Sequence, residues 1–161
     1  VAFGGYLERR NLYDSYENFE EDGTDPRNIH LGIDFWTRAG TEVRTPLDGK
    51  VHSFRNNNTR GDYGPTIILE HHVFNRPFYT LYGHLSLSSL DSLYVGRPFK
   101  QGDPLGNLGT PDVNVNYAPH LHFQLIGDLQ GNNGDYPGVS NAADLDSYMK
   151  NCPDPNLLLK L

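Results

Sequence analysis

Hydrophobic and polar residues alternate along several short stretches of this chain, and Gly, Pro, Asn and Asp separate these stretches, which is typical of β-strands joined by turns. Residues 41–54 predict strand, turn, strand, with the turn at the Asp-Gly of 48–49. Residues 66–72 and 78–85 predict two further strands, joined as a hairpin across residues 75–77. We therefore expect a mainly β protein.

The remaining patterns indicate turns and a small amount of helix. Residues 95–109 carry a glycine every few positions, which predicts tight β-turns, and they do not match a dinucleotide-binding fingerprint. Helix is expected only near the termini: residues 12–19 keep an i, i+4, i+7 apolar spacing, and residues 142–150 follow a possible N-cap at Asn141 and stop before Pro153.

The stretch HLHFQL at residues 120–125 predicts a strand with two different faces. Because side chains alternate along a strand, His120, His122 and Gln124 share one face, and the other face carries the apolar residues Leu121, Phe123 and Leu125. The apolar face is expected to pack on the core. Taken alone, the histidines favour a half-exposed strand with a polar outer face.

A second cluster, HLGID at residues 30–34, changes this interpretation. His30 and Asp34 are four residues apart and lie on the same face of an extended segment, and Gly32 favours strand over helix. Imidazole nitrogen and carboxylate oxygen are ligands that zinc prefers, and a third ligand from residues 120–125 would leave one position open for water, as in catalytic sites. The alternative is a His-Asp pair on a β-surface without a metal.

Composition and charge narrow the range of functions. The 161 residues suit one domain, and 13 Lys and Arg against 20 Asp and Glu give a net charge of −7, with no basic stripe for nucleic acid. No stretch is long and apolar enough to cross a membrane. The single cysteine, Cys152, excludes an internal disulfide. Because the chain begins at Val1 and not at Met, we expect a fragment of a longer protein, possible further domains included.

Four stretches, taken together, resemble one family. They closely resemble, in order, the lysostaphin-type or LytM-like zinc metallopeptidases, which cut peptidoglycan peptides; the stretches are HLGIDF (30–35), AGTEVRTPLDGKV (39–51), YGHLS (82–86) and PHLHFQL (119–125). The resemblance implies a small antiparallel β-structure of the duplicated hybrid motif type, with an open groove over the metal. It also implies a core at residues 30–126, an N-terminal extension at 1–29, and a C-terminal extension at 127–161 that packs on the core.

The resemblance also implies a role for each matching residue. His30, Asp34 and His122 match the three ligands of one Zn²⁺ per chain, and His84 and His120 match the two histidines that act in catalysis. One of the latter takes a proton from water and passes it to the leaving amine, while the other, if charged, stabilises the oxyanion. We assign His120 as the base, because the same strand fixes it beside His122.

The sequence departs from the family in places. The family often has Glu where this chain has Gln124, and residues 110–119 replace a glycine-rich approach, so one wall of the groove is expected to differ. His52, His71 and His72 match no motif and are interpreted as surface or strand-end residues.

The leading hypothesis is therefore a zinc endopeptidase acting on peptidoglycan stem or cross-bridge peptides. The alternatives are an inactive relative that binds or regulates a partner, a phosphocarrier of related β-fold, and a module of a larger enzyme with a non-wall substrate. The flanks at 5–13 and 135–139 are similar to those of this domain in multidomain bacterial proteins. The family implies an extracellular or cell-envelope location, and a multidomain origin implies the cytoplasm.

Overall fold

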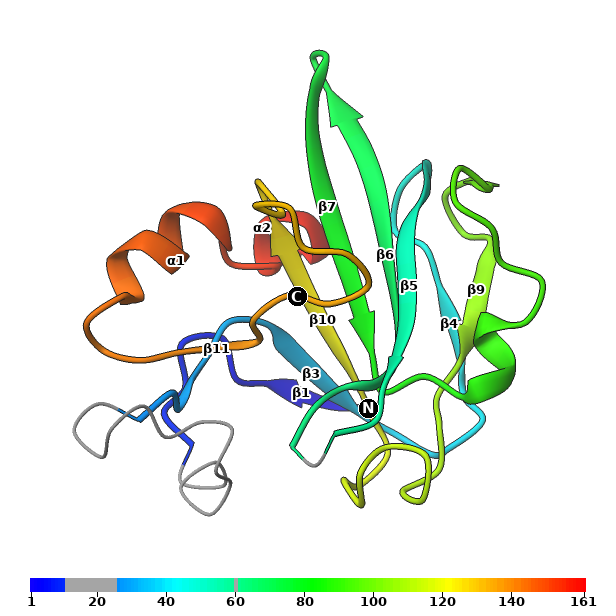
Figure 1. The fold of residues 1–161 in the computed structure, drawn as a ribbon, viewed down its shortest axis with the longest axis horizontal. Coiled ribbons are helices and arrows are strands. Elements are labelled where there is room, and N and C mark those ends of the chain that lie inside the picture. The colour runs from blue at the N-terminus through cyan, green and yellow to red at the C-terminus, as the bar shows by residue number, and fades with distance from the viewer. Residues whose placement is uncertain (11–25, 60) are drawn as a thin grey trace.

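The computed structural model describes residues 1–10, 26–59 and 61–161 (Figure 1). Its strands are β1 (Ala2–Gly4), β2 (Ile29–His30), β3 (Ile33–Trp36), β4 (Glu42–Arg44), β5 (Gly49–Asn57), β6 (Gly64–Val73), β7 (Arg76–Gly83), β8 (Pro98–Phe99), β9 (Pro104–Asn107), β10 (His120–Ile126) and β11 (Val139–Ser140). Its helices are the 3₁₀ turn η3 (Leu87–Leu90) and the α-helices α1 (Leu145–Asn151) and α2 (Asn156–Leu159).

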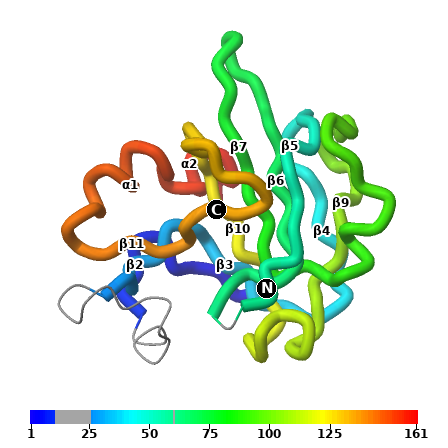
Figure 2. The backbone as a smooth tube through the Cα atoms, viewed as in Figure 1, coloured from blue at the N-terminus to red at the C-terminus, as the bar shows by residue number. Residues whose placement is uncertain are grey.

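One large sheet organises the molecule. Seven strands follow the order β1-β3-β10-β7-β6-β5-β8, and every neighbouring pair is antiparallel. Two short antiparallel pairs, β2 with β11 and β4 with β9, lie beside it (Figure 2). The described residues form no closed barrel, and the prediction of a mainly β, antiparallel fold is confirmed.

The predicted hairpin is present as β6 and β7, which form the long projection in Figure 1. Its turn lies one position earlier than expected, at Phe74 and Asn75, whose φ angles are 48° and 63°. Two successive positive φ angles are those of a type I′ turn, whose twist matches that of the flanking strands. Arg76 and Pro77 therefore belong to the strand and not to the turn.

Residues 41–54 form two strands as predicted, but the strands belong to different sheets. β4 pairs with β9, whereas β5 pairs with β6 and β8. The glycine-rich residues 95–109 supply β8 and β9 between their turns, so they hold short strands as well as the expected turns.

The C-terminal helix α1 (Leu145–Asn151) begins inside the predicted range 142–150 and ends one residue beyond it, before Pro153. Its start is later than expected, although the side chain of Asn141 accepts a hydrogen bond from the backbone N–H of Asp144 at 2.8 Å. The helix predicted at residues 12–19 lies outside the described residues. Among the described residues, no helix is long and apolar enough to cross a membrane.

Hydrophobic residues bury the large sheet on both faces. Alternate residues of its central strands enter opposite clusters, so that Ile67 and Phe123 pack on one side while Ile68 and Ile126 pack on the other. The second cluster includes residues from the C-terminal part of the chain, namely Leu129, Tyr136 and Cys152. A half-exposed outer face for residues 120–125 is therefore wrong: polar and apolar faces are both covered.

Candidate metal centre

The pairing of three neighbouring strands brings the site residues together. On β10, His122 lies opposite Asp34 of β3 on one side and opposite Gly83 of β7 on the other. His84 follows Gly83 directly, and His30 ends β2, beside β11. Residues directly opposite in an antiparallel pair have neighbouring side chains, so this register positions the cluster.

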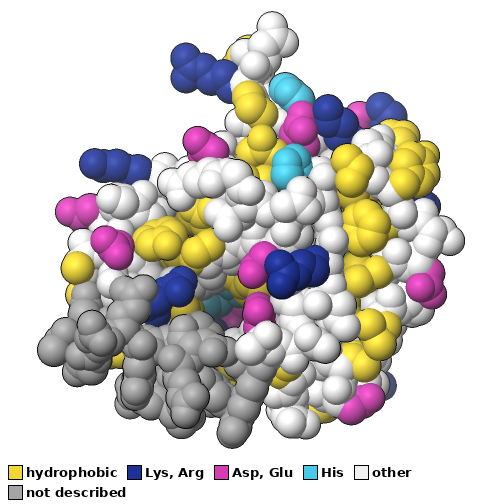
Figure 3. Space-filling view, in the orientation of Figure 1, with side chains coloured by type: hydrophobic (Ala, Val, Ile, Leu, Met, Phe, Trp, Pro, Cys, Tyr) yellow, Lys and Arg dark blue, Asp and Glu magenta, His cyan; other side chains and the backbone are white. Residues whose placement is uncertain are grey.

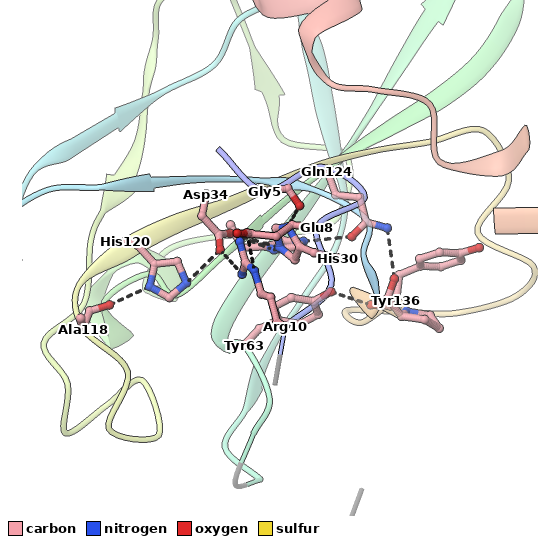
Figure 4. Close-up of polar contacts among 12 residues, drawn as sticks. Gly5, Glu8, Arg10, His30, Asp34, Tyr63, Ala118, His120, Gln124 and Tyr136 are labelled. Atoms are coloured by element: carbon pink, nitrogen blue, oxygen red, sulfur yellow. Dashed lines mark hydrogen bonds and ion pairs between the residues drawn. The ribbon is translucent and has the colours of Figure 1, made fainter. Parts of the chain in front are cut away.

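The side chains of His30, Asp34 and His122 converge on one point, and the first two are labelled in Figure 4. The Nε2 atom of His30 lies 2.9 Å from Nδ1 of His122, and Oδ1 of Asp34 lies 3.3 Å from the first and 3.2 Å from the second. All three residues are buried. Donor atoms around a tetrahedral zinc at bond lengths near 2.0 Å are separated by about 3.3 Å, so the spacing suits such an ion.

Hydrogen bonds on the far side of each ring fix which nitrogen carries the proton. Nδ1 of His30 donates to the carbonyl of Gly5 at 2.9 Å. Nε2 of His122 donates to Oε1 of Gln124 at 2.9 Å, and the Gln124 amide is oriented by its own donation to the carbonyl of Pro137 at 3.1 Å.

The two nitrogens that face each other therefore both carry lone pairs, and the third atom, Oδ1 of Asp34, has no hydrogen-bond donor among the described residues. Three acceptors pointing at one another are unfavourable without a cation between them. The residues present therefore fit a metal ion with nitrogen and oxygen ligands.

Burial and neighbouring groups set the protonation of His30 and Asp34. Burial lowers the pKa of His30, so its ring is neutral near pH 7. Burial alone would raise the pKa of Asp34, but the close approach of the His122 and His30 rings outweighs burial and holds that pKa well below its usual range. A neutral imidazole and an ionised carboxylate are the forms that bind metals.

The glycine of the HLGID stretch, Gly32, is needed because β10 approaches it closely. A Cβ atom placed there would lie 2.7 Å from Cε1 of His122 and 2.7 Å from the carbonyl oxygen of Phe123. Any larger residue would therefore push the His122 ring from its position.

The two further histidines of the motifs lie beside this cluster. The ring centres of His84 and His120 are 4.1 Å apart, and Nε2 of His120 lies 3.9 Å from Oδ2 of Asp34. Nδ1 of His120 donates to the carbonyl of Ala118 at 2.6 Å, which leaves Nε2 with its lone pair toward the cluster. Burial lowers the pKa of His120, and it lowers the pKa of His84 well below the usual range, with the neighbouring His120 adding to the shift.

The backbone turns sharply at His84. Its φ angle is 62°, in the left-handed region that most residues avoid. Hydrogen bonds hold this conformation: its N–H donates to the carbonyl of Tyr63 at 2.8 Å, and its carbonyl accepts from the N–H of Gly109 at 3.0 Å. A strained conformation fixed in this way is common at functional sites.

A groove of about 940 Å³ lies above the cluster and is hollowed into the face seen in Figure 3. Residues 116–118 form part of its lining, as expected for one wall. Sequence reasoning missed three further contributors, because nothing in the local sequence marks them: Gly5, Arg10 and Tyr63.

Of the histidines outside the motifs, His72 is exposed near the end of β6, as predicted, and His52 is half-buried within β5. The prediction for His71 is wrong, because this residue is buried. Its Nδ1 donates to the carbonyl of Asp48 at 2.7 Å and its Nε2 lies 2.7 Å from Oγ1 of Thr80, so it ties three segments together.

Comparisons with known proteins identify relatives of this arrangement. The glycyl-glycine endopeptidase ALE-1 of Staphylococcus capitis is 34% identical over 105 residues, which cover 65% of this chain and 26% of ALE-1. The DD-carboxypeptidase/endopeptidase Mpg of Neisseria meningitidis is 31% identical over 96 residues, or 60% of this chain and 20% of Mpg. The chain thus spans about a quarter of one relative and a fifth of the other.

Solved structures have the same fold. LytU matches with a TM-score of 0.52 and 25% identity, covering 83% of this chain and 81% of LytU. The catalytic domain of lysostaphin from Staphylococcus simulans matches with a TM-score of 0.51 and 22% identity, covering 75% of this chain and 80% of that domain, and this likeness concerns the fold alone.

These matches confirm the resemblance to lysostaphin-type peptidases. The model of peptidase family M23 matches residues 28–135, which include His30, Asp34, His84, His120 and His122. Because this match covers more than half of the residues of the chain, the chain belongs to peptidase family M23.

Proposed function

We propose that the chain is a zinc-dependent metalloendopeptidase that hydrolyses peptide bonds of peptidoglycan, with one Zn²⁺ held by His30, Asp34 and His122. The observation that carries this proposal is the convergence of two imidazole lone pairs and one carboxylate oxygen within 3.3 Å of one another. No described residue donates a hydrogen bond to that carboxylate oxygen. The names of ALE-1 and Mpg, both endopeptidases, support the reaction class and the substrate class.

His120 has the geometry of a general base in this proposal. When bound, zinc polarises the scissile carbonyl and lowers the pKa of water so that hydroxide is available near neutral pH. The bond from Nδ1 of His120 to Ala118 orients the ring, and its low pKa keeps Nε2 unprotonated. Nε2 then accepts the proton of the attacking water and returns it to the leaving amine.

His84 has a different role because its ring is more deeply buried than that of His120. Its pKa, well below the usual range, makes it neutral at pH 7, so it stabilises the oxyanion as an N–H donor and not as a cation. The hydrogen bonds that fix the His84 backbone limit reorganisation of this segment during the reaction.

The test is to incubate the zinc-loaded protein with defined muropeptides and with a glycine oligomer, and to identify the products by mass spectrometry. We expect cleavage of at least one of these peptides, loss of cleavage after chelation, and recovery on addition of zinc. The His120→Ala variant is the matched control, since it keeps all three proposed ligands. Protein that binds zinc but cleaves none of the peptides would favour the inactive, partner-binding alternative.

A further inference from the structure

The first ten residues lie outside the part of the chain that matches the family, yet they reach the metal centre. Three backbone hydrogen bonds of 2.8 to 2.9 Å join residues 7–10 to residues 28–30 in antiparallel fashion. This pairing continues the small sheet of β2 and β11 and positions the side chain of Arg10 beside the cluster (Figure 4).

Arg10 contacts one oxygen of the carboxylate that we propose as a zinc ligand. Its Nη1 donates to Oδ2 of Asp34 at 2.6 Å, and the two side chains are only 14% and 2% exposed. The other carboxylate oxygen, Oδ1, is the one that faces His30 and His122. The two oxygens of Asp34 are thus divided between the guanidinium and the cluster.

Further contacts fix the guanidinium itself. Its Nε donates to the carboxylate of Glu8 at 3.1 Å, and its Cζ lies 5.9 Å from the centre of the Trp36 ring. Glu8 offsets part of the positive charge, so that Arg10 repels a nearby dication less strongly than an unpaired cation would. Carboxylate, guanidinium and ring together leave Arg10 little freedom to move away from Asp34.

We infer that Arg10 is a positioning residue of the metal centre: it holds Asp34 in monodentate coordination by occupying Oδ2. This inference rests on the proposed zinc site. A carboxylate with both oxygens free can bind a metal through both, which raises the coordination number and fills the position that water or substrate needs. Arg10 prevents this, because moving Oδ2 to the metal would break a charge-assisted hydrogen bond in a buried site.

The test uses Co²⁺ in place of Zn²⁺, because the visible absorption of Co²⁺ is strong in four-coordinate sites and several-fold weaker at higher coordination. We expect a strong band in the unaltered protein and a several-fold weaker one in Arg10→Ala. Arg10→Lys should restore much of the band, since an ammonium can still engage Oδ2. Arg9→Ala is the matched control, because the neighbouring Arg9 side chain is exposed, and it should leave the spectrum unchanged.

The outcomes separate this inference from the proposed function. If the unaltered protein binds neither Zn²⁺ nor Co²⁺, the proposed metal site fails. If it binds Co²⁺ but Arg10→Ala gives the same spectrum, or if the unaltered protein already shows the weak band, Arg10 does not control the coordination of Asp34. Circular dichroism verifies folding, and Arg10→Met serves as a second variant of similar length should the alanine variant unfold.

Discussion

Replacement of Gln124 by Leu tests whether the orientation of His122 controls metal affinity. Gln124 is fully buried, accepts the Nε2–H of His122 at 2.9 Å and donates to the carbonyl of Pro137 at 3.1 Å. Leucine has a similar volume and adds little packing cost, so the main effect is the loss of these two hydrogen bonds and of a third from the Gln124 amide to Sγ of Cys152 at 3.3 Å. The buried His122 ring then keeps an N–H without its partner, whereas the carbonyl of Pro137, which is only half-buried, loses its donor beside the groove.

The expected magnitudes follow from the buried N–H of His122. An unsatisfied buried group costs about 1–3 kcal/mol, so the free energy of unfolding of the metal-free protein should fall by about 1–3 kcal/mol. Loss of the partner that fixes a metal-bound histidine weakens affinity by about 10–100-fold, or about 1.4–2.7 kcal/mol. Urea unfolding followed by circular dichroism measures the first quantity, and competition with a chromophoric chelator measures the Kd for zinc.

Gln124→Glu is the matched comparison. A carboxylate still accepts from His122, but it cannot donate to Pro137, so stability should fall while zinc affinity stays within a few-fold of the original. A zinc Kd for Gln124→Leu within twofold of the original would refute the reasoning, because His122 would then not need this partner.

Three further predictions concern other parts of the site. His120→Ala should lower the rate of peptide hydrolysis by about 10²–10⁴-fold with zinc still bound, and a fully active variant, assayed by mass spectrometry, would exclude His120 as the base. Gly32→Ala should weaken zinc binding because its Cβ would meet the His122 ring at 2.7 Å, whereas Gly127→Ala, whose nearest contact is at 3.2 Å, should bind zinc normally in the same chelator competition. Burial and the charge of Asp135 raise the pKa of Asp62 from 3.8 to about 6; since the folded state then holds the proton more tightly, this stabilisation is lost as pH rises from about 4 to about 6. Asp62→Asn should therefore be more stable than the original protein above pH 6, by up to about 1 kcal/mol for this partly exposed group. If the urea midpoints of the variant and of the original protein differ by the same amount at pH 4 and at pH 7.5, this prediction is contradicted.

Local periodicity predicted the parts of the fold and site that depend on neighbouring residues. The alternation in residues 120–125 identified a strand. Even spacing placed His30 and Asp34 together, although residues 31 and 32 belong to neither β2 nor β3 and so interrupt the extended segment. The same alternation led to a wrong expectation of exposure. Burial of the polar face depends on Tyr136 and Cys152, which pack from beyond the strand and carry no local signal of doing so.

Other features arise only from contacts between distant residues. Arg10 reaches Asp34 because residues 7–10 pair with residues 28–30, and no pattern near Arg10 indicates its partner. The left-handed backbone of His84 depends on hydrogen bonds from Tyr63 and Gly109, which lie 21 and 25 residues away.

The rate at which the single thiol, Cys152, reacts with a thiol reagent reports on opening of the protein behind the metal centre. Cys152 is fully buried, its Sγ accepts from the Gln124 amide at 3.3 Å, and burial raises its pKa to about 11, so a thiol reagent cannot react with it in the closed protein. Labelling therefore proceeds only when the C-terminal segment lifts from the sheet. Its rate measures how often the shell behind His122 opens, without any engineered cysteine, and bound metal should slow that rate.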